Sequence, residues 1–326
     1  MLKTLGAPTS LRQAMTFFAD KDFAFQFFVQ LRWPNGVRCM ACESERLSLI
    51  KTRRIWQCLE CGKQFGPKLG TIFEDSALGL EKWLPAMWML ANAKNGISSC
   101  ELARALGVTQ KTAWFMLGRI RKAMADNGGD PFGGAVEIDE TYIGGLAKFM
   151  HKGRGSKHKR VIKGSTGMVG KTAIMGILRR GRGKKGVSQI RASVVHSIRK
   201  GAMTAKVKAN VVAGSKVYTD ALMSYNGLKA DYEHFVIDHA KQYVRDRVIH
   251  TNGLENFWSL LKRAIKGTYV SVDPFHLFRY LDEQVFRFNH RKSTDGERFL
   301  HVARSIIGVR LDWRDLTGKD LNPATT

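Results

Sequence analysis

Residues 250–263 have the sequence His-Thr-Asn-Gly-Leu-Glu-Asn-Phe-Trp-Ser-Leu-Leu-Lys-Arg. As a helix, this segment would be amphipathic, with polar residues on one side and apolar residues on the other. The polar flank holds Asn252, Glu255, Asn256, Ser259, Lys262 and Arg263, and the apolar side holds Leu254, Phe257, Trp258 and Leu261. A carboxylate two turns ahead of a Lys-Arg pair suits a divalent metal held beside a phosphate backbone. An ordinary solvated ion-pair face has the same spacing, so residues elsewhere in the chain must decide between the two.

Composition points to nucleic acid as the partner. The 326 residues are 44% hydrophobic, as in ordinary globular proteins of two or three domains. Lys and Arg number 53 against 28 Asp and Glu, a net charge of +25 that nucleic acid matches better than a membrane surface does. The apolar run at 83–93 is too short to span a bilayer, and the first 20 residues lack a signal-peptide cleavage site. We therefore expect a cytoplasmic protein without a membrane partner.

Cysteine spacing predicts a structural zinc site. Two pairs, Cys39-x-x-Cys42 and Cys58-x-x-Cys61, are separated by 15 residues. Two such turns bring four thiolates to one tetrahedral zinc ion, and tight pairs are more typical of metal binding than of disulfides in a reducing compartment. Four free core cysteines are the alternative. Cys100 has no partner in sequence and is expected to be a buried small hydrophobe.

Residues 98–125 resemble a helix-turn-helix. Ser98 and Glu101 form a capping-box pattern, Gly107 ends the first helix, and Thr109 can cap the second. With its apolar positions buried, the second helix should turn Gln110, Lys111, Arg119, Arg121 and Lys122 outward. These residues would reach a groove or phosphates, whereas a plain helical hairpin with a basic solvent face is the alternative. The net charge favours DNA contact.

The segment 126–131 breaks the helical pattern and is the best domain boundary in the sequence. Beyond it, Ala135–Gly145 alternates as a strand that places Glu137 and Asp139 on one face. Residues 141–219 then contain no acid but 19 Lys and Arg, and Asp220 closes a second strand. A lone carboxylate there either neutralises a neighbour or holds a cation for a polyanion, and Glu255 downstream favours the cation.

The remaining segments complete an α/β pattern. Strands are expected at 171–178, 191–195 and 233–238, and a helix near 202–212. Residues 274–289 should form a helix under the 250–263 helix, with Phe275, Leu277, Phe278, Leu281, Val285 and Phe286 inward. The glycine- and lysine-rich stretch 145–170 is expected to be a mobile loop along a phosphate backbone, with a solubilising insert as the alternative. Four other carboxylates are weaker candidates for the metal site: Glu137, Glu140, Asp238 and Asp246. Glu140 should face away from Asp139, and Asp238 and Asp246 can pair with nearby basic residues.

Three blocks together resemble a known family. Residues 137–145, 217–220 and 250–263 are similar to the three catalytic blocks of a DDE transposase. With the cysteine pairs and Arg32–Gly36 ahead of them, they resemble more narrowly the bacterial ISXO-like insertion-sequence transposases with an N-terminal zinc ribbon, which are related to the Merlin elements. The likeness covers almost the whole chain. It implies an RNase H-like core, a mixed sheet flanked by helices, acting in the bacterial cytoplasm at the nucleoid.

The resemblance also implies roles for single residues. Asp139 and Asp220 match the two metal-binding aspartates, Glu255 the third acid, and Lys262 the basic residue seven positions later. Since some relatives have asparagine as the third ligand, Asn252 or Asn256 is the alternative to Glu255. Two Mg²⁺ or Mn²⁺ ions would support in-line phosphoryl transfer, and one Zn²⁺ would hold the ribbon. The expected DNA contacts are Gln110, Lys111, Arg119, Lys152, Arg154, Lys159, Arg160 and Arg263.

The expected organisation has four parts: an N-terminal helix and zinc ribbon at 1–70, a helix-turn-helix region at 71–130, an RNase H-like domain at 131–310 and a tail at 311–326. The expected function is metal-dependent cleavage and strand transfer of an insertion sequence through its terminal inverted repeats. The partner is double-stranded DNA, bound at paired ends by a homodimer. A non-catalytic DNA-binding regulator and a nuclease with the same core are the alternatives.

Overall fold

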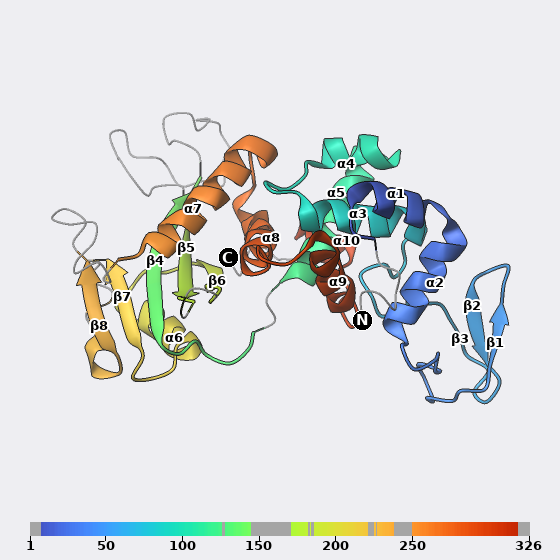
Figure 1. Cartoon of the computed structure of the whole chain (residues 1–326), viewed down its shortest axis with the longest axis horizontal. Coiled ribbons are helices and arrows are strands. Elements are labelled where there is room, and N and C mark those ends of the chain that lie inside the picture. Colours follow the sequence, from blue (N-terminus) through green and yellow to red (C-terminus); the bar gives the residue numbers. More distant parts are fainter. Residues whose placement is uncertain are drawn as a thin grey trace. The chain divides into compact units, whose positions relative to one another are not determined.

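The computed structural model describes residues 8–125, 128–144, 171–181, 183, 186–220, 225, 227–237 and 250–318. They belong to two compact units, Met1–Ala125 with Lys292–Thr326, and Asp126–Arg291 (Figure 1). The chain thus returns to the first unit after Arg291, whereas residues up to 310 were expected to belong to the domain that holds the strands. None of the helices in these ranges combines the length and the apolar character that a membrane span requires.

The first unit begins with two helices where the sequence pattern predicted one. Helices α1 (Leu11–Ala19) and α2 (Lys21–Arg32) separate at Asp20, whose carboxylate accepts hydrogen bonds from the first backbone N–H groups of α2. A three-stranded antiparallel sheet follows, in the order β1 (Leu47–Ile50), β2 (Ile55–Cys58), β3 (Gln64–Phe65). Trp56 of β2 stacks on Phe25 of α2, which joins the small sheet to the helices.

The helices of the first unit pack around buried aromatic side chains. They are α3 (Leu80–Asn92), α4 (Ser99–Leu106), α5 (Gln110–Met124), α9 (Asp295–Ser305) and α10 (Trp313–Thr317). Ser98 caps α4, Thr109 caps α5, and Gly107 between them is left-handed at φ 61°, as the sequence predicted. Phe299 of α9 is buried against Phe18 and Trp88, and this contact explains why α9 belongs to this unit. Cys100 is exposed, so its expected burial was wrong.

The second unit is a five-stranded mixed sheet flanked by helices, as expected. Its strands are β4 (Ala135–Ile143), β5 (Thr172–Arg179), β6 (Gln189–Val195), β7 (Lys216–Asp220) and β8 (Glu233–Ile237), and its long helices are α6 (Lys200–Asn210), α7 (Asn252–Ala264) and α8 (Leu277–Asn289). The order is β6-β5-β4-β7-β8. Strands β5 and β6 run antiparallel to their neighbours, whereas β7 and β8 run parallel to β4. Since β4 is central, its side chains face both layers of helices.

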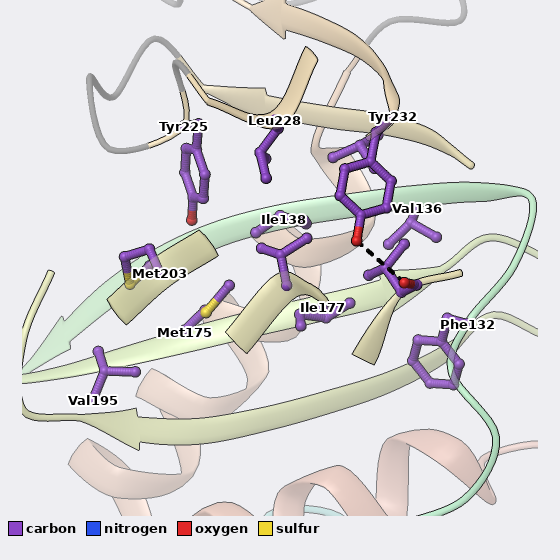
Figure 2. Close-up of a cluster of buried hydrophobic side chains, with 13 residues drawn as sticks. Phe132, Val136, Ile138, Met175, Ile177, Val195, Met203, Tyr225, Leu228 and Tyr232 are labelled. Carbon is purple, nitrogen blue, oxygen red and sulfur yellow. Dashed lines mark hydrogen bonds between the residues drawn. The ribbon is translucent and has the colours of Figure 1, made fainter. Parts of the chain in front are cut away.

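Alternation along β4 separates its apolar residues from its acids. Val136 and Ile138 lie in a core shared with Met203 of α6, and the hydroxyl of Tyr232 in this core donates to the carbonyl of Val211 at 3.2 Å (Figure 2). The opposite face of the sheet packs on α7 and α8 through a second core. That core includes Ile174, Leu178, Leu254, Phe257, Trp258, Leu277, Leu281, Val285 and Phe288. Glu137 and Asp139 therefore face α7.

Helix α8 packs beside α7 in this second core, as expected, but two of its predicted inward residues are exposed. Phe275 and Phe278 are 37% and 39% exposed. A 3₁₀ turn, Pro274–His276, precedes α8, and the Asp273 carboxylate accepts from the N–H of Phe275. Phe275 lies in the 3₁₀ turn ahead of the α-helix, and the buried stripe of α8 runs through Leu277, Leu281, Val285 and Phe288, with Phe278 outside it.

Candidate functional site

Strand pairing brings two of the predicted acids together. Strands β4 and β7 are parallel and pair Ile138 with Thr219, so the next residues, Asp139 and Asp220, are neighbours on adjacent strands. One carboxylate oxygen of each, and one of Glu140, lie within 4.8 Å of one another. Carboxylate oxygens are the ligands that Mg²⁺ and Mn²⁺ prefer. The cluster could therefore hold a divalent metal.

Glu140 was expected to face away from Asp139, and this prediction was wrong. Strict alternation along β4 does point the two side chains to opposite faces. Strand β7 ends at Asp220, however, so the longer glutamate side chain can reach the same point past the strand end. Within the described part of the chain, the buried Oε1 atom of Glu140 has no hydrogen-bond partner. A buried acceptor without a donor is a fit for a cation.

The cluster destabilises its own ionised form. The pKa of Asp139 is raised to about 6, mainly by burial and then by the charges of Asp220 and Glu255, against hydrogen bonds from Trp258 and the Glu140 backbone that lower it. Burial likewise raises the pKa of Glu140 to about 8, with added repulsion from Asp220 and Asp139. A bound cation would relieve both costs, because it replaces repulsion between carboxylates by attraction to a common charge.

Trp258 of α7 holds Asp139 from above the sheet. Its indole Nε1 donates to Asp139 Oδ2 at 2.9 Å. Asp139 pairs across the sheet with Gly176 of β5, and a Cβ on that glycine would lie 2.7 Å from side-chain carbons of both Leu254 and Trp258. Gly176 therefore leaves the space that the indole occupies. Trp258 was expected to serve in packing alone, although its indole, which can only donate and lies one turn after Glu255, was the available signal.

The other predicted residues of α7 lie around this cluster. Glu255 is exposed in the first turn of the helix, and its charge contributes to the raised pKa of Asp139. In the described residues, the group within mutual 4.8 Å contains Asp139, Glu140 and Asp220 but not Glu255. The remaining polar positions are all exposed: Asn252, Asn256, Lys262 and Arg263. Their roles stay predictions.

Glu137 forms a second charged centre that the sequence analysis ranked low. The residue is 1% exposed, and its Oε1 accepts from Arg180 Nε at 2.6 Å. Its Oε2 accepts from the backbone N–H of Leu254 at 3.0 Å. Glu137 therefore has protein partners for both oxygens, and among the described residues it is not part of the group that Asp139, Glu140 and Asp220 form.

The four paired cysteines converge as their spacing predicted. The Sγ atoms of Cys39 and Cys61 lie 3.6 Å apart, as do those of Cys42 and Cys58, and all four sulfurs lie within 4.8 Å of one another. Each pair sits on a tight turn, since the N–H of Glu43 donates to the Cys39 carbonyl and that of Gly62 to the Cys58 carbonyl. Four sulfurs around one point fit a structural zinc ion.

The predicted DNA contacts on α5 divide into exposed and buried residues. Gln110 and Lys111 are exposed at its start, with Lys111 Nζ 4.9 Å from the ring centroid of Trp313. Arg119 is 5% exposed and donates to the carbonyls of Ile72 and Glu74, both at 2.7 Å. Its prediction as an outward residue was wrong, because the long basic side chain satisfies buried backbone carbonyls.

Arg121 was also expected outward and is buried at 2% exposure. The Lys122 ammonium group donates to the Arg310 carbonyl. Several predicted residues lie outside the described residues: Lys152, Arg154, Lys159, Arg160, Asp238 and Asp246.

Together these observations define a two-part protein, with a four-cysteine centre in one unit and a carboxylate cluster able to hold a divalent metal in the other. Comparison with known proteins gives the particular family. Residues 131–289 match the ISXO2-like transposase domain, and residues 20–64 match a transposase zinc-ribbon domain. The chain belongs to the ISXO2-like transposase family.

Two relatives support this assignment. A protein described as an uncharacterized protein in transposable element ISH50, from Halobacterium salinarum, is 28% identical over 282 residues, covering 83% of this chain and 93% of that protein. An uncharacterized transposase-like protein of Haemophilus influenzae is 30% identical over 98 residues, covering 30% of this chain and 78% of that protein. The first similarity extends over both units of the chain.

Proposed function

We propose that the chain is an active DDE-type transposase with an RNase H-like core that cleaves an insertion sequence at its terminal inverted repeats and joins it to target DNA. One observation carries the proposal: the carboxylates of Asp139 and Asp220 meet where β7 ends beside the middle of the parallel strand β4, inside the domain that matches the transposase family. Glu255, whose charge reaches Asp139, is the third acid of this proposal.

The residues at the cluster fit divalent metal. Three carboxylates supply oxygen ligands, and the Oε1 atom of Glu140 is buried without a donor. When bound, Mg²⁺ or Mn²⁺ would supply charge stabilisation for phosphoryl transfer. Asp139 and Asp220 would hold the metal, with the Trp258 indole fixing the rotamer of Asp139. Glu140 is an additional ligand or a neighbour that holds a proton, and in the second role it keeps the cluster's charge low until metal and DNA arrive.

Basic residues would position the phosphate backbone. Lys262 and Arg263 are exposed on α7, seven and eight residues after Glu255, and would neutralise charge on the transferred phosphate. Helices α4 and α5 would form a helix-turn-helix that places the exposed Gln110 and Lys111 at DNA. The zinc ribbon would add a second DNA-binding surface, and paired ends favour a homodimer.

A strand-transfer assay tests the proposal. The zinc-loaded full chain is incubated with Mg²⁺, target plasmid and duplexes carrying the inverted repeats that flank the gene. We expect joined product for the wild type and a loss of at least roughly a thousandfold for Asp139→Ala and Asp220→Ala, since ligands of a catalytic metal act as a unit. Glu255→Gln should also abolish joining. Glu233→Gln is the matched control, because Glu233 is an exposed carboxylate on β8.

The outcomes separate the alternatives. Joining that survives Asp139→Ala would remove the catalytic role of the cluster. Binding of the repeats without cleavage by the wild type would favour a DNA-binding regulator. Hydrolysis without joining would favour a nuclease. Retained activity in Glu255→Gln together with loss in Asn252→Ala or Asn256→Ala would move the third ligand to an asparagine.

A further inference from the structure

Helix α7 begins without a cap of its own. A helix leaves its first backbone N–H groups without partners inside the helix, and a polar side chain just ahead of it usually accepts from one of them. Thr251 occupies the N-cap position of α7, but its side chain accepts no such bond. The carboxylate of Glu137, from the central strand β4, supplies a side-chain acceptor instead: its Oε2 accepts from the N–H of Leu254 at 3.0 Å, a donor that it shares with the Thr251 carbonyl at 2.9 Å.

The cap is held by a buried ion pair. Oε1 of Glu137 accepts from Arg180 Nε at 2.6 Å, and the side chains of the two residues are 2% and 18% exposed. The Arg180 guanidinium also donates to the backbone carbonyl of His250, just ahead of α7, and lies 4.3 Å over the ring of Tyr218 on β7. The pair therefore connects β4, β7 and the chain entering α7. A negative charge at this end of the helix is also favoured by its dipole.

Glycine at position 253 permits the close approach. A Cβ there would lie 2.8 Å from Oε2 of Glu137 and 3.1 Å from a methyl carbon of Leu178. No positive φ requires this glycine, since its backbone is that of the helix. The space that the Glu137 carboxylate needs thus explains why glycine occupies position 253, although glycine weakens the first turn of a helix.

These contacts link the two halves of the candidate site. Asp139 follows Glu137 by two residues on β4 and faces the same side of the sheet, and Glu255 follows Leu254 directly in α7. We infer that Glu137 is a positioning residue: its carboxylate, locked by Arg180, fixes the first turn of α7 against β4 and so sets the distance between Glu255 and Asp139. The catalytic part of this inference rests on the proposed function, whereas the cap itself does not.

The test is Mn²⁺ binding to the zinc-loaded full chain, measured by calorimetry without DNA. Asp139→Ala should abolish binding at the cluster. Glu137→Gln keeps the size of the side chain and a carbonyl acceptor but removes the charge facing Arg180. We expect it to weaken Mn²⁺ binding roughly tenfold, the usual effect of losing a partner that orients metal ligands. Gly253→Ala should act in the same direction without changing any charge, although alanine favours the helix. Glu233→Gln is the control and should bind as the wild type does.

A double variant distinguishes positioning from general loss of structure. If Glu137 acts through Glu255, adding Glu137→Gln to Glu255→Gln should weaken Mn²⁺ binding no further than Glu255→Gln alone. A full additional tenfold loss in the double variant, or wild-type binding in both Glu137→Gln and Gly253→Ala, would overturn the inference. Absence of Asp139-dependent Mn²⁺ binding in the wild type would instead refute the proposed function, so the two failures are distinguishable.

Discussion

Replacing Glu140 by glutamine should stabilise the metal-free protein near neutral pH. The pKa of Glu140 is raised from 4.5 to about 8, mainly by burial and then by Asp220 and Asp139. The folded state therefore retains a proton that the unfolded chain releases, and stability is lost as pH rises from 4.5 towards 8. Over the roughly 2.5 pH units up to pH 7, at about 1.36 kcal/mol per unit, this cost reaches about 3 kcal/mol before screening by solvent reduces it.

Glutamine does not ionise, so Glu140→Gln escapes this cost. We expect a free energy of unfolding about 2 to 3 kcal/mol above the wild type at pH 7 and a difference of about 1 kcal/mol at pH 5. Trp258 is the one tryptophan between residues 126 and 291, so urea unfolding of the second unit can be followed by fluorine NMR of 5-fluorotryptophan. Added Mn²⁺ should stabilise the wild type more than the variant.

The reasoning would be refuted by a stability difference that does not change between pH 5 and pH 7. A variant less stable than the wild type at both values would be equally damaging, because it would mean that the Glu140 carboxylate is stabilised by donors in the folded state. Asp231→Asn is a suitable control, since Asp231 pairs with Lys208 at the surface and away from the cluster.

Three further predictions concern other parts of the chain. Cys58→Ser should release zinc, unfold the ribbon and weaken binding to the inverted repeats, while leaving Mn²⁺ affinity of the second unit unchanged in calorimetry; a loss of Mn²⁺ affinity would contradict this separation. Arg119→Ala should lower the free energy of unfolding of the first unit in urea by about 2 kcal/mol, because buried carbonyls lose their donor. Lys111→Ala should lower DNA affinity without changing stability. A stable Arg119→Ala variant together with an unstable Lys111→Ala variant that binds DNA normally would refute both assignments. Trp258→Phe removes a hydrogen bond that lowers the pKa of Asp139, so Mn²⁺ affinity should fall more at pH 6 than at pH 8, and an equal loss at both would argue against the indole as a donor to this carboxylate.

Local patterns predicted the elements because they depend on neighbouring residues. The period of the apolar positions placed α7, and alternation along β4 put Glu137 and Asp139 on the face towards it. Spacing likewise predicted the cysteine cluster, since two tight turns can hardly present their thiolates in another way.

The errors at the candidate site and in α5 involve contacts between distant segments. The Arg119 position in α5 reads as exposed by charge alone, but its partners are carbonyls more than forty residues upstream, which helical periodicity does not reveal. Strand alternation predicts that Glu140 faces away from Asp139, and the sequence does not reveal that β7 ends at Asp220, where the Glu140 side chain can join the cluster. The Glu137 cap joins residues 117 positions apart, and helical periodicity does not reveal that the glycine at position 253 leaves room for this carboxylate.

The position of bound manganese tests the central claim most directly. Crystals of the zinc-loaded full chain grown with Mn²⁺ and duplex ends should show anomalous scattering at the manganese edge about 2.1 Å from carboxylate oxygens of both Asp139 and Asp220. Density for zinc should lie separately among the four cysteines. Manganese bound elsewhere in the chain, with the carboxylates of Asp139 and Asp220 contacting none, would contradict the assignment of this cluster as the catalytic centre.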